Sequence, residues 1–134
     1  MARYMLDTNI CVYLMKAQPP QVAARFADCY VGDVLISAIT LAELEFGIFT
    51  SSDQAKARNN VAALTRDIIV APFDSAAAHS YPPVRFETRG RKRDQLDKLI
   101  AAHAISLGVT LVTNNVRDFS AYSGLQIQNW LDDD

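Results

Sequence analysis

The sequence predicts an α/β domain, a three-layer α/β/α sandwich in which a central, mainly parallel sheet of four to five strands carries helices on both faces. Five short β-prone runs are spread along the chain, and longer Ala-rich or amphipathic stretches separate them. Parallel strands need such long crossover connections, and the connecting helices cover the two faces of the sheet. The 134 residues suit a single domain, residues 1–134, whose core needs no disulfide support.

The predicted strands are residues 4–6, 34–36, 68–70, 109–112 and 125–127. Helical patterns follow the first three strands in pairs, at residues 8–16 and 20–29, 40–50 and 53–66, and 74–88 and 94–107. In the last of these, apolar residues recur at helical spacing, and Gly108 follows as a helix stop. His103 lies on this apolar stripe, which predicts a histidine packed in the core. The pair Pro82 and Pro83 predicts a kink or break within residues 74–88.

The composition excludes several classes of protein. Half of the residues are apolar and 21% are charged, which is ordinary for a globular domain and not for a disordered chain. No apolar run approaches the roughly 20 residues of a membrane span, and an acid as early as Asp7 does not fit a signal peptide. Cys11 and Cys29 have no metal-binding spacing, so we expect reduced thiols and a cytoplasmic location.

Polar residues stand just past strand ends, where ligands bind in open α/β sheets. Asp7 follows the first strand and Glu43 comes shortly after the second. Asp97 lies early in the helix that leads to the fourth strand, and Asn115, with Asp118 behind it, follows that strand. One topology brings these segments to the same end of the sheet, where the carboxylates repel one another unless a cation lies among them. Oxygen ligands without thiolate or imidazole partners suit Mg²⁺ or Mn²⁺ and not zinc.

For each of these residues, a purely structural role is an alternative to metal binding. Asp7 can cap the helix that follows. Glu43 has capping-box spacing from Thr40, although Ser37 is an equally good cap. Asp97 can complement a helix dipole, and an asparagine pair is a common turn former. The metal-site interpretation therefore depends on the residues acting together.

Three segments resemble the acidic motifs of PIN-domain nucleases, specifically those of VapC toxins from type II toxin–antitoxin modules. They are MLDTNICVYL, ISAITLAELEFG and LDKLIAAHAISLGVTLVTNNVRDF, and they run in order along nearly the whole chain. The resemblance matches Asp7, Glu43 and Asp97 to the family's metal-binding acids, Asn115 to its fourth position and Asp118 to a more variable acid. It thus implies five catalytic residues, of which Asp7, Glu43, Asp97 and Asn115 bind the metal.

The sequence departs from the family pattern in two places. Asn115 stands where many PIN domains have Asp. The stretch RGRKRDQLD stands where many VapC sequences have a Gly-Pro pair ahead of the acid that Asp97 matches. Thr8 and Thr113 match small hydroxyl residues beside the site, and we expect them to contact the substrate.

Basic residues cluster just before the last long helix and in its first turn. Six of the thirteen Lys and Arg residues lie in this basic stretch: Arg85, Arg89, Arg91, Lys92, Arg93 and Lys98. The net charge is −2, so contact with nucleic acid has to come from such a local cluster. We expect Arg89, Arg91, Lys92 and Arg93 to bind substrate phosphates, the alternative being a solvated charged surface.

The resemblance implies a Mg²⁺- or Mn²⁺-dependent endoribonuclease that is the toxin of a type II module and hydrolyses phosphodiester bonds of structured RNA such as tRNA. It also implies a homodimer, a VapB-type antitoxin, and operator DNA bound only through the antitoxin complex. One alternative is a catalytically depleted PIN-like module that only binds RNA or protein. Another is a phosphatase with Asp7 as nucleophile, although such enzymes usually place a second acid where this chain has Asn9.

Overall fold

The computed structural model describes residues 2–132, and within them five parallel strands form one sheet in the order β3-β2-β1-β4-β5. The strands are β1 (Tyr4–Leu6), β2 (Val34–Ser37), β3 (Ile69–Ala71), β4 (Thr110–Val112) and β5 (Ile127–Gln128). The helices are α1 (Thr8–Lys16), α2 (Pro20–Ala27), α3 (Ala38–Phe49), α4 (Gln54–Asp67), α5 (Ser75–Glu87), α6 (Gln95–Leu107) and α7 (Val116–Phe119). Among these residues, no helix combines the length and apolar character needed to cross a membrane.

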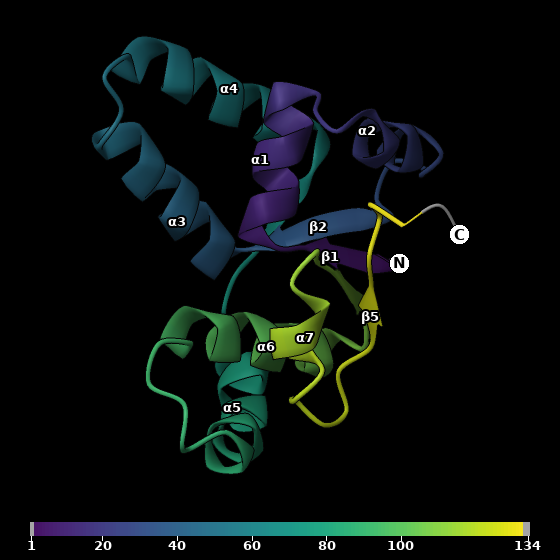
Figure 1. Cartoon of the computed structure of the whole chain (residues 1–134), viewed down its shortest axis with the longest axis vertical. Coiled ribbons are helices and arrows are strands. Elements are labelled where there is room, and N and C mark those ends of the chain that lie inside the picture. The colour runs from purple at the N-terminus through teal and green to yellow at the C-terminus, as the bar shows by residue number, and fades with distance from the viewer. Residues whose placement is uncertain (1, 133–134) are drawn as a thin grey trace.

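The helices form a layer on each side of the sheet. Helices α1 to α4 lie on one face, and α5, α6 and α7 lie on the other (Figure 1). Neighbouring residues of β1 serve the two faces, because successive side chains of a strand point in opposite directions. Met5 belongs to the core that includes Val84 and Ala101, whereas Leu6 belongs to the core that includes Ile10 and Leu44. The predicted three-layer arrangement is confirmed.

The predicted elements form within two residues of their expected ends, but one helix was missed and one predicted break is absent. The helix α7 was not predicted, because its four residues are too few to show a periodic pattern. Of the kink or break expected at Pro82 and Pro83, the break does not occur, since α5 runs through both residues. The carbonyls that lose a backbone partner belong to Ala78 and His79, which are exposed, so water can satisfy them.

The packed histidine predicted on α6 is confirmed. His103 is buried, its Nδ1 lies 2.7 Å from Ser37 Oγ, and its ring makes an edge-to-face contact with the Phe73 ring. Burial lowers its pKa, which keeps the imidazole neutral at physiological pH. His103 thus joins α6 to the end of β2.

The sheet register sets the position of the polar residues at its carboxyl edge. Leu6 of β1 pairs with Val112 of β4, so the next residues, Asp7 and Thr113, lie side by side. The Asp7 backbone N–H donates to the Val112 carbonyl at 3.0 Å. Since β1 is the central strand, its end is flanked by the ends of β2 and β4, and α3 starts directly after β2 (Figure 1).

Candidate active site

A small polar cavity of about 120 Å³ opens at this carboxyl edge of the sheet. Residues from α1, α3, α6 and the segment after β4 line it: Asp7, Thr8, Asn9, Glu43, Asp97, Ile100, Asn115 and Phe119. The structure therefore brings together the four residues predicted as metal ligands, although they are far apart in sequence. Asp118 does not line this cavity.

Asp7 is held rigidly at the end of β1. Its side chain caps α1 by accepting a hydrogen bond from the Ile10 N–H at 3.0 Å, and it also hydrogen-bonds the Thr113 side chain. Only 5% of the residue is exposed. Burial, followed by the charge of Glu43, raises the pKa of Asp7, so its ionised form is disfavoured here. Asp7 therefore caps α1 and also lines the cavity.

Glu43 lies in the second turn of α3. The cap of this helix is Ser37, whose Oγ accepts from the Ile39 N–H at 3.0 Å, which decides between the two caps that the sequence allowed. Glu43 is therefore not a capping-box residue. Instead, its Oε1 accepts a 2.6 Å hydrogen bond from the Thr8 hydroxyl, which ties α3 to the start of α1.

Asp97 completes the group of carboxylates from the first turn of α6. Burial raises its pKa to about 6, and the negative charges of Glu43 and Asp7 add to the effect, as do those of Asp94 and Asp118. Carboxylates that raise one another's pKa are close enough to repel, and a cation among them would relieve this repulsion.

Asn115 and Asp118 have different positions, although both were predicted at the site. The Asn115 side-chain amide donates to Asp118 Oδ2 at 3.0 Å, and Asn115 faces the cavity while Asp118 is exposed beside it. Thr113 corrects our expectation of a substrate contact, because it is completely buried. Its Oγ1 accepts from the Asn115 N–H at 2.9 Å, and its side chain hydrogen-bonds Asp7, so it orients both residues.

The loop between α5 and α6 places cationic residues next to Asp97. Arg91, Lys92 and Arg93 line a second cavity of about 330 Å³ together with Asp94, Asp97 and Asp118. Arg91 is fixed there, since its Nη1 donates to the Asp118 carbonyl at 2.9 Å. Arg89 lies elsewhere: its guanidinium stacks on the Phe86 ring, 4.2 Å from the centroid, and bonds the Phe86 carbonyl.

Lys98 does not belong to this cationic surface, contrary to its place in the basic stretch. Its side chain is only 2% exposed, and its Nζ donates to the carbonyls of Thr88 and Arg91 at 3.1 and 3.2 Å. Nζ also lies 3.1 Å from Asp94 Oδ1, while Asp94 Oδ2 accepts a 2.6 Å bond from the Tyr122 hydroxyl. These contacts define the shape of the loop before α6, which is one of the two places where the sequence departs from the VapC pattern.

The hydrogen bond between Asp94 and Tyr122 shifts the pKa values of the two groups in opposite directions. Burial tends to raise the pKa of Asp94, but the Tyr122 hydroxyl and the Lys98 ammonium outweigh it and hold this pKa below its ordinary value. Burial and the neighbouring carboxylate raise the pKa of Tyr122. Sequence reasoning missed Tyr122, because nothing in the sequence links it to a residue 28 positions earlier.

The arrangement offers oxygen donors for a hard cation beside a cationic surface for phosphate. Asp7, Asp97 and the Asn115 amide supply such donors, and Glu43 supplies one that Thr8 already contacts. Within residues 2–132, no three Asp, Glu, His or Cys side chains stand in a ready-made coordination geometry. The donor chemistry fits Mg²⁺ or Mn²⁺, and water molecules would have to complete the shell.

Comparisons with known proteins agree on one family. The PIN domain matches residues 4–125. The "tRNA(fMet)-specific endonuclease VapC" of Shigella flexneri is 36% identical over 97% of this chain and 99% of its own length. The "Ribonuclease VapC1" of Haemophilus influenzae is 36% identical over 95% of this chain and 97% of its own.

Solved structures show the same fold. The DNA-bound VapBC complex of Salmonella typhimurium contains a chain that superposes with a TM-score of 0.89 at 33% identity, covering 97% of this chain and 99% of that one. A chain of the VapBC2 complex of Rickettsia felis, bound to a promoter fragment, gives 0.84 at 31% identity, with 95% and 98% covered. The likeness covers nearly the whole length of each chain, and this chain belongs to the PIN-domain family, among the VapC ribonucleases.

Proposed function

We propose that the protein is a Mg²⁺- or Mn²⁺-dependent endoribonuclease that acts as the toxin of a type II toxin–antitoxin module. The observation that carries the proposal is the small cavity in which Asp7, Glu43, Asp97 and Asn115 converge from four segments. The relatives named as VapC nucleases support the same reaction.

The side chains have distinct tasks in this proposal. Asp7 and Asp97 hold the ion, Glu43 and Asn115 complete its shell directly or through water, and Thr113 keeps Asp7 and Asn115 in position. A bound divalent ion would activate a water molecule and neutralise charge on the phosphate. Asp118 does not line the cavity, so its part is to hold the Asn115 amide.

The substrate class we propose is structured RNA such as tRNA. Arg91, Lys92 and Arg93 line a cavity that shares Asp97 with the small acidic cavity, where they can bind phosphates next to the bond that is cut. Electrostatic contacts of this kind release counterions, and they make binding sensitive to salt. Arg89 takes part only if its guanidinium leaves the Phe86 ring.

The test is cleavage of tRNA by the purified protein, freed of any antitoxin. We expect cutting with Mg²⁺ or Mn²⁺, none in excess EDTA, and full recovery when Mn²⁺ is restored, because the oxygen donors need a hard cation between them. Activity should also fall steeply as KCl rises. Cutting that persists in EDTA would remove the metal mechanism, and salt-sensitive binding without any cutting would favour the alternative of a depleted binding module.

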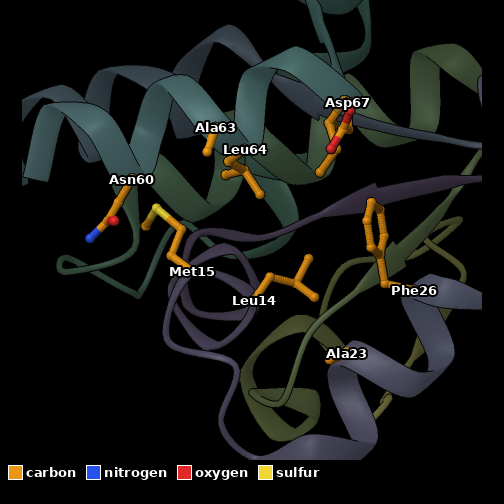
Figure 2. A pocket seen from close by; sticks show the side chains of 9 residues that line it. Leu14, Met15, Ala23, Phe26, Asn60, Ala63, Leu64 and Asp67 are labelled. Carbon is orange, nitrogen blue, oxygen red and sulfur yellow. The ribbon is translucent and has the colours of Figure 1, made fainter.

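We also infer a protein partner of the VapB type, because relatives with high structural similarity were solved as VapBC complexes. An apolar groove of about 300 Å³ runs between α1, α2 and α4 and shares no lining residue with the acidic cavity. Figure 2 shows Leu14, Phe26 and Leu64 around it, one from each helix, with Asp67 nearby. An amphipathic segment of the antitoxin fits this combination of apolar wall and polar rim.

The substitution Ala63→Glu tests this surface. Ala63 is exposed and lines the groove, so its replacement forces a carboxylate against the apolar face of the partner, and antitoxin affinity should fall at least 100-fold. Ala62→Glu is the matched control, since Ala62 is exposed on the same helix outside the groove. Calorimetry gives both affinities, and tRNA cleavage by both variants should equal that of the parent. Equal affinity of the two variants would place the antitoxin elsewhere.

The homodimer and the binding of operator DNA through the antitoxin complex stay predictions for this chain. Sedimentation equilibrium of the protein alone tests the first. A mobility-shift assay with and without antitoxin tests the second.

A further inference from the structure

A further, more apolar cavity of about 300 Å³ adjoins the acidic one. Thr8 and Glu43 line both cavities, so the two share a wall. The rest of the lining is Ala42, Phe46 and Leu96. Phe46 is 67% exposed and Leu96 is 46% exposed, which leaves an aromatic and an aliphatic side chain open to solvent beside the proposed site of cleavage.

The sequence attaches each of these apolar residues to one of the carboxylates. Phe46 follows Glu43 by three positions on α3, so it lies one turn further along the same side of the helix. Leu96 directly precedes Asp97 on α6. Neither residue belongs to the two core clusters found in residues 2–132, and the buried residues of α3 are Thr40, Leu44 and Ile48. The fold therefore does not need an aromatic ring at position 46.

The charges on the two sides of the acidic cavity differ. Beyond Asp97 lies the cationic loop with Arg91, Lys92 and Arg93, which suits phosphates. Beyond Glu43 lies the apolar cavity, whose one ionisable lining residue is Glu43 itself, so a phosphate is repelled there and a neutral ring is not. Unpaired nucleobases stack on exposed aromatic rings in this way, whereas bases inside a duplex keep their faces covered.

We propose that Phe46 and Leu96 form a binding subsite for an unpaired nucleobase adjoining the phosphodiester that is cut. This inference rests on the proposed nuclease function and adds to it the selection of single-stranded segments, such as loops, over duplex. The Thr8 hydroxyl is engaged by Glu43, so the subsite offers few groups that could read hydrogen bonds on the base. It recognises a stacked ring and tolerates different bases.

The test uses a synthetic RNA hairpin whose loop carries the mapped cleavage site of the parent protein. Phe46→Ala should lower kcat/KM on this hairpin by about 10- to 100-fold, because base stacking on an aromatic ring is lost. Phe46→Trp should retain activity, and Phe46→Leu should lose most of it. Phe49→Ala is the matched control: Phe49 is 75% exposed on the same helix and does not line the cavity.

Two further hairpins connect the loss to the base itself, each with an abasic ribose at one of the nucleotides that flank the cut. On one of these abasic hairpins, kcat/KM of the parent should fall by the same factor that Phe46→Ala causes on the intact hairpin. On that abasic hairpin, kcat/KM of Phe46→Ala should not fall further. Full activity of Phe46→Ala, or equal further loss on both abasic hairpins, would overturn the subsite.

A change in sedimentation mass with Phe46→Ala would also overturn it, since Phe46 would then be covered by a second copy of the chain. If Phe46→Ala weakens antitoxin binding and leaves cleavage intact, the surface belongs to that partner and the subsite is again overturned. A parent protein that cuts no RNA with Mn²⁺ would instead remove the proposed function, so the two failures are distinguishable.

Discussion

Asp7→Asn should reduce tRNA cleavage by orders of magnitude and leave a folded protein. Asn keeps the size and the hydrogen-bonding reach of Asp, and it is an equally good N-cap, so the bond from the Ile10 N–H should persist. What is lost is the negative charge that holds the ion against the phosphate. The measurement is the initial rate of tRNA cleavage at saturating Mn²⁺.

The apo form of Asp7→Asn should be more stable than the parent at neutral pH. Burial and the charge of Glu43 raise the pKa of Asp7, so its contribution to stability is complete at low pH and is lost as the pH rises through this raised pKa. The neutral amide avoids that loss. The gain in the free energy of unfolding should therefore be largest near pH 7 and should vanish near pH 3.

Two outcomes would contradict this assignment. An Asn variant that cleaves as well as the parent would remove Asp7 from the catalytic residues. A variant that unfolds early at neutral pH would show that the ionised cap matters more than the crowding of carboxylates. Asp53→Asn is a suitable control, because Asp53 caps α4 through the Lys56 N–H in the same way and lies outside the acidic cavity.

Lys98→Met should destabilise the protein by about 3–5 kcal/mol, which corresponds to a fall in Tm of roughly 10–20 °C. Met fills the space of the lysine stem, but the Asp94 carboxylate and the carbonyls of Thr88 and Arg91 lose a cation from a nearly dry position. Removing one partner of a buried ion pair leaves the other charge uncompensated. Urea unfolding followed by circular dichroism measures the change.

The control is Lys92→Met, since Lys92 is exposed in the same segment and should change stability by less than about 0.5 kcal/mol. The pKa of Asp94 is held below its ordinary value, so the stability it contributes is present above that value and is lost as the pH falls through the lowered pKa. The difference between the parent and Lys98→Met should therefore shrink under strongly acidic conditions. A Lys98→Met protein as stable as the parent at pH 7 would show that the loop is held by its other contacts.

Local sequence signals predicted the succession of strands and helices with small errors at the ends. Strand β1 has the predicted bounds, and α6 ends at Leu107 with Gly108 as its C-cap, whose φ of 66° lies in the left-handed region that glycine adopts readily. The convergence of Asp7, Glu43, Asp97 and Asn115 could also be predicted, because three of them follow strand ends, Asp97 starts the helix that leads to β4, and one α/β topology brings these segments together.

The sequence by itself thus determined the fold class and the order of the acidic residues, since these depend on periodicity and on spacing along the chain, and the resemblance of three of its motifs indicated the family. Only the tertiary structure decided that Thr113 and Lys98 are buried, that Tyr122 bonds Asp94, and that Phe46 stands open beside Glu43. Burial and pairing depend on which distant segments fold against a residue, and a local pattern carries no record of them. A basic stretch in the sequence therefore contained both a solvated cationic surface and the buried ammonium group that holds it in place.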